Sequence, residues 1–450
     1  MSRNDDYENR LNGQLELAGI ARLSPEQRRF IEEQARIYRF SFQELRQLGE
    51  ICTDLQMWGE PPIEQLWSGL EPPSGAGKAA RQQILQQLQL HRQRLREMPN
   101  HYPESSPRSP DATDRIRRVT EERPQLGLGW CPVASSRTRC CNLLTLDAVQ
   151  NCGFDCSYCS IQSFYHGDEV RFDASFAQKL ERLEIDPQKI YHIGTGQSSD
   201  SLMWGNQAGI LDALMAFARR HPNVILELKT KSKNIAYLLK NDILPNVLCT
   251  WSLNPQTLID NEEHLTASLE ERLVAARQLA DRGILVGFHF HPMIHYDRWR
   301  EEYGAIFSRL VEVFEPAEVA LVSLGTLTYI KSVLKKLRGR EGLRSQILKM
   351  PMVEAAGKLS YPDAIKDRDV QPCLYGAHAL ARSGLFLSLH GEPDALATGV
   401  RFRVCRQRCV GAGDETELSG KDRATPQRDR LRWERRRSWL SAPPFLSICC

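Results

Sequence analysis

Three cysteines near the middle of the chain have a spacing that suits a metal cluster. Cys152, Cys156 and Cys159 follow the pattern Cys-x3-Cys-x2-Cys. Three thiolates can bind three irons of a cubane iron–sulfur cluster, whereas a cubane held through every iron needs four cysteines. The spacing therefore predicts a 4Fe–4S cluster with one iron left open to a small molecule.

A zinc site is the alternative interpretation of the same residues. Cys-x2-Cys pairs are common in zinc sites with four nitrogen or sulfur ligands, and Cys140 and Cys141 could supply the remaining two. The context favours the open cluster, because the three cysteines follow an expected strand and precede a series of strand–helix units. Zinc ribbons and ferredoxins are not built in that way.

The composition indicates a protein of the cytoplasm. The chain has 450 residues, a formal net charge of +3 and 13 cysteines, an odd number that does not suit a full disulfide framework. Its first residues are polar and acidic, unlike a signal peptide, and no apolar run approaches the roughly 20 residues that span a bilayer. Reduced thiols and an oxygen-sensitive cluster both fit the cytosol.

The first part of the chain is expected to be helical. Ser24 and Ser41 are predicted N-caps of two helices, and residues 1–98 are interpreted as a helical accessory region. A helix-turn-helix DNA-binding unit is the weaker alternative, because no cluster of base-reading side chains is present. Residues 99–129 are rich in proline, serine and charge, and predict a flexible linker.

From residue 130 to residue 365 the pattern alternates between strands and helices. Expected strands cover residues 142–149, 189–193, 224–229, 247–253, 284–291 and 319–324. Expected helices cover residues 176–183, 209–220, 235–240, 269–281 and 299–314. Alternation of this kind implies parallel pairing through helical crossovers, so the sequence predicts an α/β fold with a partial (β/α)6 barrel.

Groups with chemical potential follow the ends of these strands, where the chemistry of such barrels gathers. The residues are Gly194, Thr195, Gly196 and Gln197 after the second strand, Lys229 after the third, and Ser252 and Asn254 after the fourth. The glycines let a ligand approach the backbone, and a lysine can neutralise a carboxylate. Each signal is weak alone, since a tight turn or a surface lysine explains it equally well.

Histidines mark the fifth strand. His289 and His291 are two residues apart, so both side chains should lie on one face of the sheet. Together with His295 they could bind a metal ion. Contact with substrate, or packing inside the barrel, is the favoured interpretation.

Four motifs in order resemble the spore photoproduct lyase branch of the radical S-adenosylmethionine (SAM) superfamily. They are Cys-Gly-Phe-Asp-Cys-Ser-Tyr-Cys, Ile-Gly-Thr-Gly-Gln-Ser-Ser-Asp-Ser, Glu-Leu-Lys-Thr-Lys-Ser and Trp-Ser-Leu-Asn-Pro. The resemblance covers about residues 130–365. It implies an enzyme that cleaves SAM reductively at a 4Fe–4S cluster and generates a 5′-deoxyadenosyl radical. In the founding enzymes, that radical starts the repair of a thymine lesion in DNA.

The resemblance also implies roles for single residues. Cys152, Cys156 and Cys159 would bind the cluster, and Tyr158 would lie beside it. Lys229 and Ser252 would hold the polar end of SAM, with the 194–197 loop against it, and Asn254 would be a further SAM-binding residue. A reductant such as flavodoxin or ferredoxin would be the partner, together with DNA.

Two positions depart from the branch. The founding lyases carry a hydrogen-donating cysteine where this chain has Gln197, and a tyrosine where it has Ser160. We therefore take Tyr158 and Gln197 as the candidate catalytic positions. We expect the reaction with the substrate to differ from that of the founding lyases. Cys249 or Tyr191 could substitute as hydrogen donor. The alternatives are the same radical chemistry on a substrate other than DNA, or a zinc-stabilised nucleic-acid-binding protein.

The end of the chain follows another pattern. The resemblance ends near residue 369, and residues 366–450 are expected to form an irregular, arginine-rich tail that is either disordered or the product of an altered reading frame. Residues 430–439, with five arginines and two tryptophans, could bind nucleic acid through phosphate contacts and stacking.

Overall fold

The chain forms two compact units in a computed structural model. The model describes residues 3–73, 77–102, 116–130, 143–165, 167, 169–340, 342–355, 357–362, 364–365 and 387–390. One unit comprises Met1–Tyr102, His295–Asp297 and Lys331–Met352, and the other comprises Pro103–Ile294, Arg298–Ile330 and Val353–Cys450. The expected boundary near residue 98 is close to the observed one. Residues 331–352 were expected in the barrel, and they cluster with the first unit instead.

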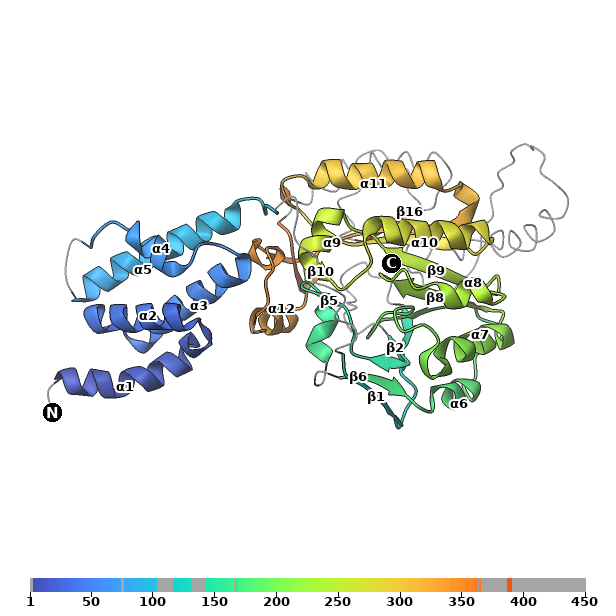
Figure 1. Cartoon of the computed structure of the whole chain (residues 1–450), viewed down its shortest axis with the longest axis horizontal. Coiled ribbons are helices and arrows are strands. Elements are labelled where there is room, and N and C mark those ends of the chain that lie inside the picture. Colours follow the sequence, from blue (N-terminus) through green and yellow to red (C-terminus); the bar gives the residue numbers. More distant parts are fainter. Residues whose placement is uncertain are drawn as a thin grey trace. The chain divides into compact units, whose positions relative to one another are not determined.

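The first unit is helical (Figure 1). Its α-helices are α1 (Arg3–Leu17), α2 (Pro25–Tyr38), α3 (Phe42–Trp58), α4 (Ile63–Ser68), α5 (Gly77–Glu97) and α12 (Lys331–Arg338). The expected caps are present: Ser24 accepts a hydrogen bond from the backbone of Gln27, and Ser41 forms a capping box with Glu44. Apolar residues of α1 to α5 form one buried core. The interpretation of residues 1–98 as an accessory region stays a prediction.

An eight-stranded sheet is the centre of the second unit. Its strands lie in the order β16-β12-β11-β9-β8-β7-β3-β2. Their bounds are β2 (Leu128–Trp130), β3 (Leu144–Leu146), β7 (Tyr191–Thr195), β8 (Val224–Thr230), β9 (Val247–Ser252), β11 (Val286–Met293), β12 (Val319–Thr326) and β16 (Leu387–His390). The six strands from β3 to β12 are parallel, as expected, and β2 is antiparallel to β3.

Helices connect the parallel strands, and all but the one at Gln256–Glu262 lie nearly where the pattern places them. They are α6 (Phe176–Glu181), α7 (Ile210–Arg220), α8 (Ala236–Lys240), α9 (Gln256–Glu262), α10 (Leu269–Asp281) and α11 (Trp299–Val313). Short 3-10 helices lie at Ile20–Arg22, Ser160–Phe164, Gln207–Gly209, Pro316–Glu318 and Ile347–Lys349. An α/β fold is therefore confirmed, and the closure of its sheet into a partial barrel stays a prediction.

Several short strands were not expected as separate elements, and only the one that begins at Val149 overlaps an expected strand, 142–149. They are β1 (Arg118–Glu121), β4 (Val149–Gln150), β5 (Asp155–Cys156), β6 (Val170–Asp173), β10 (Glu263–His264), β13 (Thr328–Tyr329), β14 (Val353–Ala355) and β15 (Lys358–Ser360). Strand β1, which pairs with β6, lies within the expected linker 99–129, and β2, which extends the main sheet, begins within that linker and ends one residue after it. Strand β16 lies within the expected tail and pairs with β12. The rest of residues 366–450 lies outside the described residues.

The two faces of the parallel sheet differ in chemistry. Because side chains alternate along a strand, the pairing registers assign each residue to a face. One face, here called the polar face, carries His192, Glu227, Lys229, Thr250, Ser252, His289, His291 and Ser323. The other carries mostly apolar residues such as Leu228, Trp251 and Phe288. Parallel strands are usually apolar on both sides, so the polar face indicates a functional surface.

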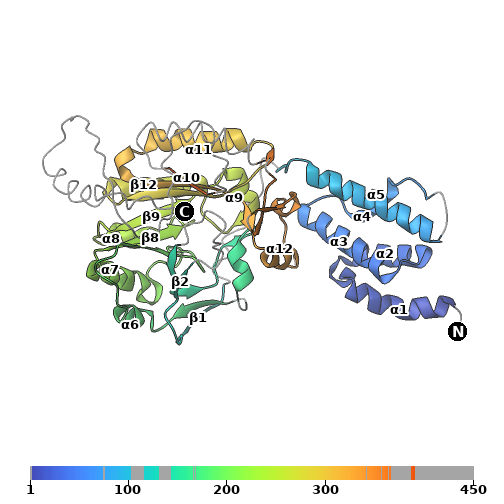
Figure 2. The same ribbon diagram turned by 180° about the vertical axis from the view of Figure 1, so that it is seen from behind.

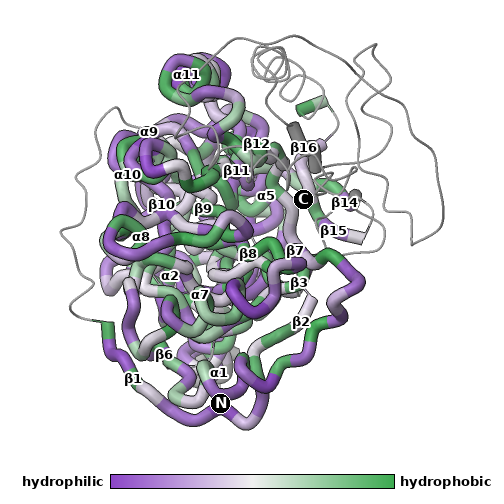
Figure 3. The backbone as a smooth tube through the Cα atoms, turned by 90° about the vertical axis from the view of Figure 1, so that its right-hand side faces the viewer, coloured by the Kyte–Doolittle hydropathy of each residue, from purple (hydrophilic) through white to green (hydrophobic). Residues whose placement is uncertain are grey.

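Helices cover the apolar face (Figure 1 and Figure 2). Phe288 of β11 lies with its ring 5.1 Å from that of Phe314, and Phe290 lies 4.6 Å from Phe307 of α11. The tube of α11 alternates between hydrophilic and hydrophobic residues in Figure 3, as expected for a helix with one buried side. No helix in the described parts of the chain is long and apolar enough to cross a membrane.

Candidate active site

The cysteine loop begins where β4 ends and runs through β5 to the 3-10 helix at Ser160–Phe164. Asn151 has a positive φ of 62° at its start, and its side-chain amide donates to the carbonyl of Glu169 at 2.7 Å. Cys156 lies in β5, which pairs antiparallel with β10, opposite Glu263. The amide of Cys159 donates to the carbonyl of Cys156 at 3.1 Å. Local pairing therefore presents three cysteines from one short, folded loop.

The chemistry of these thiols fits a cationic metal cluster. Cys152, Cys156 and Cys159 are free thiols, and burial raises the pKa of each. Negative charge on Cys152 or Cys159 would raise the pKa of Cys156 further, so the three sulfurs lie within electrostatic reach of each other. Bare thiolates are unfavourable in such a place, and metal cations would stabilise them.

No three His, Cys, Asp or Glu side chains among the described residues converge as ligands of a single metal ion. A cubane does not require that convergence, because each of its cysteines binds a different iron. Cys140 and Cys141, the further ligands of the zinc alternative, lie outside the described residues.

A buried carboxylate anchors the tyrosine of the cysteine loop. Glu263 accepts hydrogen bonds from the Tyr158 hydroxyl, from Lys231 Nζ at 2.9 Å and from Asn254 Nδ2 at 2.7 Å. The Tyr158 hydroxyl also accepts from Lys231 Nζ at 3.1 Å and from Asn254 Nδ2 at 3.2 Å. Asn254 Oδ1 in turn accepts from the Tyr303 hydroxyl at 2.6 Å. Burial and the neighbouring Glu263 raise the pKa of Tyr158, so its phenol stays protonated.

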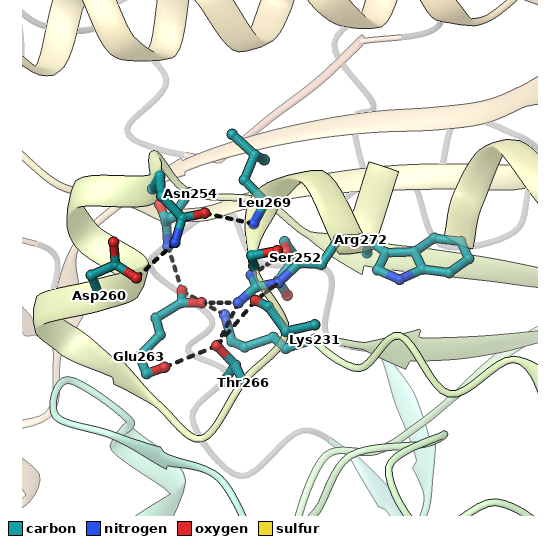
Figure 4. Close-up of polar contacts among 12 residues, drawn as sticks. Lys231, Ser252, Asn254, Asp260, Glu263, Thr266, Leu269 and Arg272 are labelled. Carbon is teal, nitrogen blue, oxygen red and sulfur yellow. Dashed lines mark hydrogen bonds and ion pairs between the residues drawn. The ribbon is translucent and has the colours of Figure 1, made fainter. Parts of the chain in front are cut away.

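Arg272 completes this group, here called the Glu263 network (Figure 4). Its Nη2 donates to Glu263 Oε2 at 2.6 Å and to Thr266 Oγ1 at 2.7 Å. Its other nitrogens donate to the carbonyls of Ser252 at 2.8 Å and Ala267 at 2.9 Å. Burial alone would raise the pKa of Glu263, but Lys231 and Arg272 hold it well below its usual range. The carboxylate is therefore ionised between two cations.

The loop after β7 lies beside the first cysteine. Gly196 has a φ of +79°, and a Cβ there would meet Ser201 Oγ at 2.5 Å and the carbonyl of Lys229 at 2.9 Å. Thr195 Oγ1 hydrogen-bonds to Ser201 Oγ at 2.7 Å. Asp200 accepts a hydrogen bond from Thr230 Oγ1 at 2.7 Å, and in addition to burial the charge of its carboxylate raises the pKa of Cys152. The loop after β7 and the cysteine loop are therefore neighbours, and the expected contact of residues 194–197 with SAM stays a prediction.

A second buried carboxylate lies on the polar face. Glu227 of β8 accepts from Thr250 Oγ1 at 2.6 Å and lies 2.7 Å from His289 Nε2 and 2.8 Å from His192 Nε2. Burial would raise the pKa of Glu227, but His289 and His192 hold it well below its usual range. Burial and the charge of Lys229 lower the pKa of His289 to about 4, which keeps that imidazole neutral at pH 7.

The remaining expected residues lie in different surroundings. Lys229 and Ser252 share the polar face with His289, and the rings of His289 and His291 lie 5.6 Å apart, which confirms their common face. His295 groups with the helical unit. The side chain of Asn254 is fully buried within the Glu263 network, where the sequence suggested a contact with SAM.

The two proposed substitutes for the hydrogen-donating cysteine are poorly placed. Cys249 lies between Leu248 and Thr250 on β9, so its side chain is on the apolar face, opposite that of Thr250. Tyr191 is the first residue of β7, at the end of the strand away from the cysteine loop. Neither position favours a hydrogen donor at the polar face, and the suggestion that Cys249 or Tyr191 replaces the missing thiol stays a prediction.

Sequence reasoning missed Glu263 and Arg272. They lie 32 and 41 positions after Lys231 in the sequence, and neither belongs to a motif. The signal that could have identified Glu263 is the pair of adjacent acids Glu262–Glu263 shortly before the expected helix 269–281, which contains Arg272. Tyr165 was also missed, although burial and the three cysteines raise its pKa.

Comparisons with known proteins identify a similar family. The model of the spore photoproduct lyase family matches residues 146–332. The spore photoproduct lyase of Clostridium acetobutylicum is 23% identical over 238 residues, which are 50% of this chain and 68% of that protein. The lyase of a Geobacillus species is 25% identical over 174 residues, or 38% of this chain and 51% of that protein.

Solved structures of the same name are also similar. A spore photoproduct lyase mutant with bound AdoMet and dinucleoside spore photoproduct aligns with a TM-score of 0.49 and 18% identity, over 65% of this chain and 87% of that one. A lyase complexed with dinucleoside spore photoproduct aligns with a TM-score of 0.49 and 18% identity, over 60% and 81%. The family match and the curated relatives confirm the predicted resemblance to the spore photoproduct lyase branch.

Proposed function

We propose that this chain, a radical SAM enzyme whose residues 146–332 resemble spore photoproduct lyase, binds a 4Fe–4S cluster through Cys152, Cys156 and Cys159. The proposal depends on one observation: a single folded loop brings three free thiols together. They lie close enough that negative charge on Cys152 or Cys159 would raise the pKa of Cys156. A cluster with an open iron supplies the electron that cleaves SAM into methionine and a 5′-deoxyadenosyl radical. The zinc-binding alternative is disfavoured because the matched family consists of enzymes.

The polar face supplies the binding groups for SAM in this proposal. Lys229 would pair with the carboxylate of SAM, and Ser252 would donate a hydrogen bond beside it. Gly196 would let the loop after β7 pack closely against Ser201 and the backbone of Lys229, because a Cβ there would meet both, and this would place the backbone of the loop beside the ligand. The six parallel strands would curve around this face as a partial barrel and keep water out.

Three expected SAM contacts have other tasks in this proposal. Asn254 would orient Tyr158, since it donates to that hydroxyl and to Glu263. Gly194 would serve packing, because a Cβ there would meet Leu143 at 2.5 Å. Thr195 would fix the loop through its hydrogen bond to Ser201. In this proposal SAM is bound by Lys229, Ser252 and the backbone around Gly196.

The substrate step is proposed by similarity to lyases that act on the spore photoproduct. The substrate would be a photoproduct in DNA, and a low-potential donor such as flavodoxin or ferredoxin would supply electrons in the cytoplasm. Gln197 has no S–H bond, and Cys249 faces the other side of the sheet. Neither Gln197 nor Cys249 therefore offers a thiol to the polar face, which favours a second candidate, in which the same radical chemistry acts on a substrate other than DNA.

Anaerobic reconstitution tests the proposal. The purified chain should bind about four irons and four sulfides, and dithionite with SAM should then yield 5′-deoxyadenosine. A Cys156→Ala variant should yield none, whereas Cys52→Ala, which changes a buried cysteine of the helical unit, should behave as wild type. A colourless chain with stoichiometric zinc would refute the proposal. Incubation with irradiated DNA then separates the two substrates: unchanged lesions beside active SAM cleavage exclude repair.

A further inference from the structure

Positive charge is concentrated in one part of the helical unit. Residues 1–102 contain 13 lysines and arginines and 14 acids, so this segment is nearly neutral. Residues 331–352, which cluster with it, contain seven lysines and arginines and a single glutamate. The positive charge of the unit therefore belongs to one short segment, which begins with α12.

Helix α12 exposes this charge to solvent. Its apolar side chains Val333, Leu334 and Leu337 are buried, and the helix contains no acid. Such a helix is amphipathic, with an outer side that is cationic. The outer side and the turn after it are here called the basic surface, whose exposed residues are Lys331, Lys335, Lys336, Arg340 and Arg344.

Two arginines beside the basic surface form no ion pair within the described part of the chain. Arg338 Nη2 of α12 donates to the carbonyl of Leu348 at 3.0 Å, and Arg338 Nε is buried without a hydrogen-bond partner. Arg96 Nε of α5 donates to the carbonyl of Lys349 at 3.3 Å. Because the two carbonyls are adjacent in the chain, the two guanidinium groups lie close together. Each has further N–H donors for an anion.

The acids around this place do not balance its charge. Asp54 of α3 accepts from Arg92 Nε at 2.8 Å, and Glu60 lies 3.2 Å from Lys349 Nζ. Each of these carboxylates neutralises one cation. Residues 92–97 and 331–352 together contain ten lysines and arginines, whereas the acids in or beside them are Asp54, Glu60, Glu97, Asp297 and Glu341. A clear excess of positive charge remains.

The composition of the basic surface fits a phosphate backbone. Protein surfaces mix both signs of charge, whereas a DNA duplex carries one negative charge per roughly 1.7 Å of its axis. Lysine supplies point charges for phosphates, and the planar fork of arginine matches phosphate oxygens. Residues 331–352 contain no Phe, Tyr or Trp on which an unpaired base could stack. The chemistry therefore favours the backbone of a duplex over single strands or an acidic protein.

We propose that the basic surface, with Arg96 and Arg338, binds the phosphate backbone of duplex DNA. The inference rests on the proposed function for the choice of DNA, but it does not need the cluster. Phosphate contacts hold a protein on the duplex without reading its sequence. The helical unit would therefore bind DNA at any sequence and with or without a lesion. Nearly all of this surface lies outside the residues that match the family.

Fluorescence anisotropy with a short, labelled, undamaged duplex tests this surface on the iron-free full chain. The double variant Lys335→Gln, Lys336→Gln removes two exposed cations. Its affinity should fall about tenfold or more, and the slope of log affinity against log salt should decrease by about 2. Arg338→Gln should decrease that slope by about 1. The matched control is Arg28→Gln, Arg29→Gln, which removes two adjacent cations of α2 that pair with acids and should bind as wild type.

The outcomes separate this inference from the proposed function, because iron binding is measured in another sample. Failure to bind iron contradicts the proposed function alone. An affinity of the lysine variant within about twofold of wild type overturns the inference, because another part of the chain then binds DNA. Equal losses in the α12 and α2 variants overturn it too, since net charge would explain them. Binding of flavodoxin through these lysines, without duplex binding, would assign the surface to an acidic protein and overturn it. Should Arg338→Gln not fold by circular dichroism, the exposed lysine pair decides.

Discussion

The neutral state of His289 predicts a loss of stability in acid. Burial lowers the pKa of this imidazole from 6.5 to about 4, beside the carboxylate of Glu227. Between these two pH values the unfolded chain binds a proton that the folded chain does not. The contribution of the neutral His289 to the free energy of unfolding is therefore fully present above about pH 6.5, and it is lost as the pH falls toward 4.

The magnitude follows from the two pKa values. At pH 5 the unfolded imidazole is almost fully protonated and the folded one is almost fully neutral. Proton linkage then lowers the free energy of unfolding by about 2 kcal/mol relative to neutral pH. This corresponds to roughly a 30-fold rise in the equilibrium constant for unfolding of the sheet unit. The variant His289→Gln keeps an N–H donor for Glu227 but does not titrate, so it should lack this part of the acid sensitivity.

Hydrogen–deuterium exchange measures the effect in one unit at a time. Peptides from β8 and β11 should lose about 2 kcal/mol of protection between pH 7.5 and pH 5 in wild type, relative to His289→Gln. Peptides from α2 and α3 of the helical unit serve as an internal control and should not differ between the two proteins. Equal acid sensitivity of β8 in wild type and variant would refute the assignment of a neutral, buried His289.

Three further outcomes follow from the site. Arg272→Met should destabilise the sheet unit by about 3–5 kcal/mol, because it removes one cation from the buried Glu263 and leaves several acceptors unpaired. Hydrogen exchange measures this loss, and a value under about 1 kcal/mol would contradict the expectation. Gly196→Ala should abolish 5′-deoxyadenosine formation, whereas Gly209→Ala, with a similar φ of +69° and open space around it, should retain it. An equal loss of activity in both variants would show that backbone strain, and not the close packing at Gly196, causes the loss. Cys249→Ser should leave SAM cleavage unchanged, because the thiol lies on the apolar face; a large loss of rate would reject that placement.

The regular elements of the sheet unit were largely predictable from sequence. Strands β7, β8, β9, β11 and β12 lie within about two residues of their expected bounds, because each is an apolar run between amphipathic helices. The helices follow from their periodicity, and Ser24 and Ser41 follow from capping chemistry. Both signals are local in the chain, which is why they suffice.

The elements and contacts that were missed depend on distant partners. Strand β1 was hidden in a proline-rich and charged segment, and only its pairing with β6 makes it a strand. Glu263 was hidden because its ionised state depends on Lys231 and Arg272, which the fold brings together. Asn254 was assigned to a ligand because sequence shows that an amide is present but not which hydrogen bonds it forms.

The central claim is that one iron of the cluster has no cysteine ligand. Mössbauer spectroscopy of the ⁵⁷Fe-reconstituted chain tests this most directly, before and after addition of SAM. The account predicts that about one iron in four changes its signal when SAM binds, while the other three keep the signals of thiolate-bound irons. Spectra that show four equivalent irons, unchanged by SAM, would contradict it.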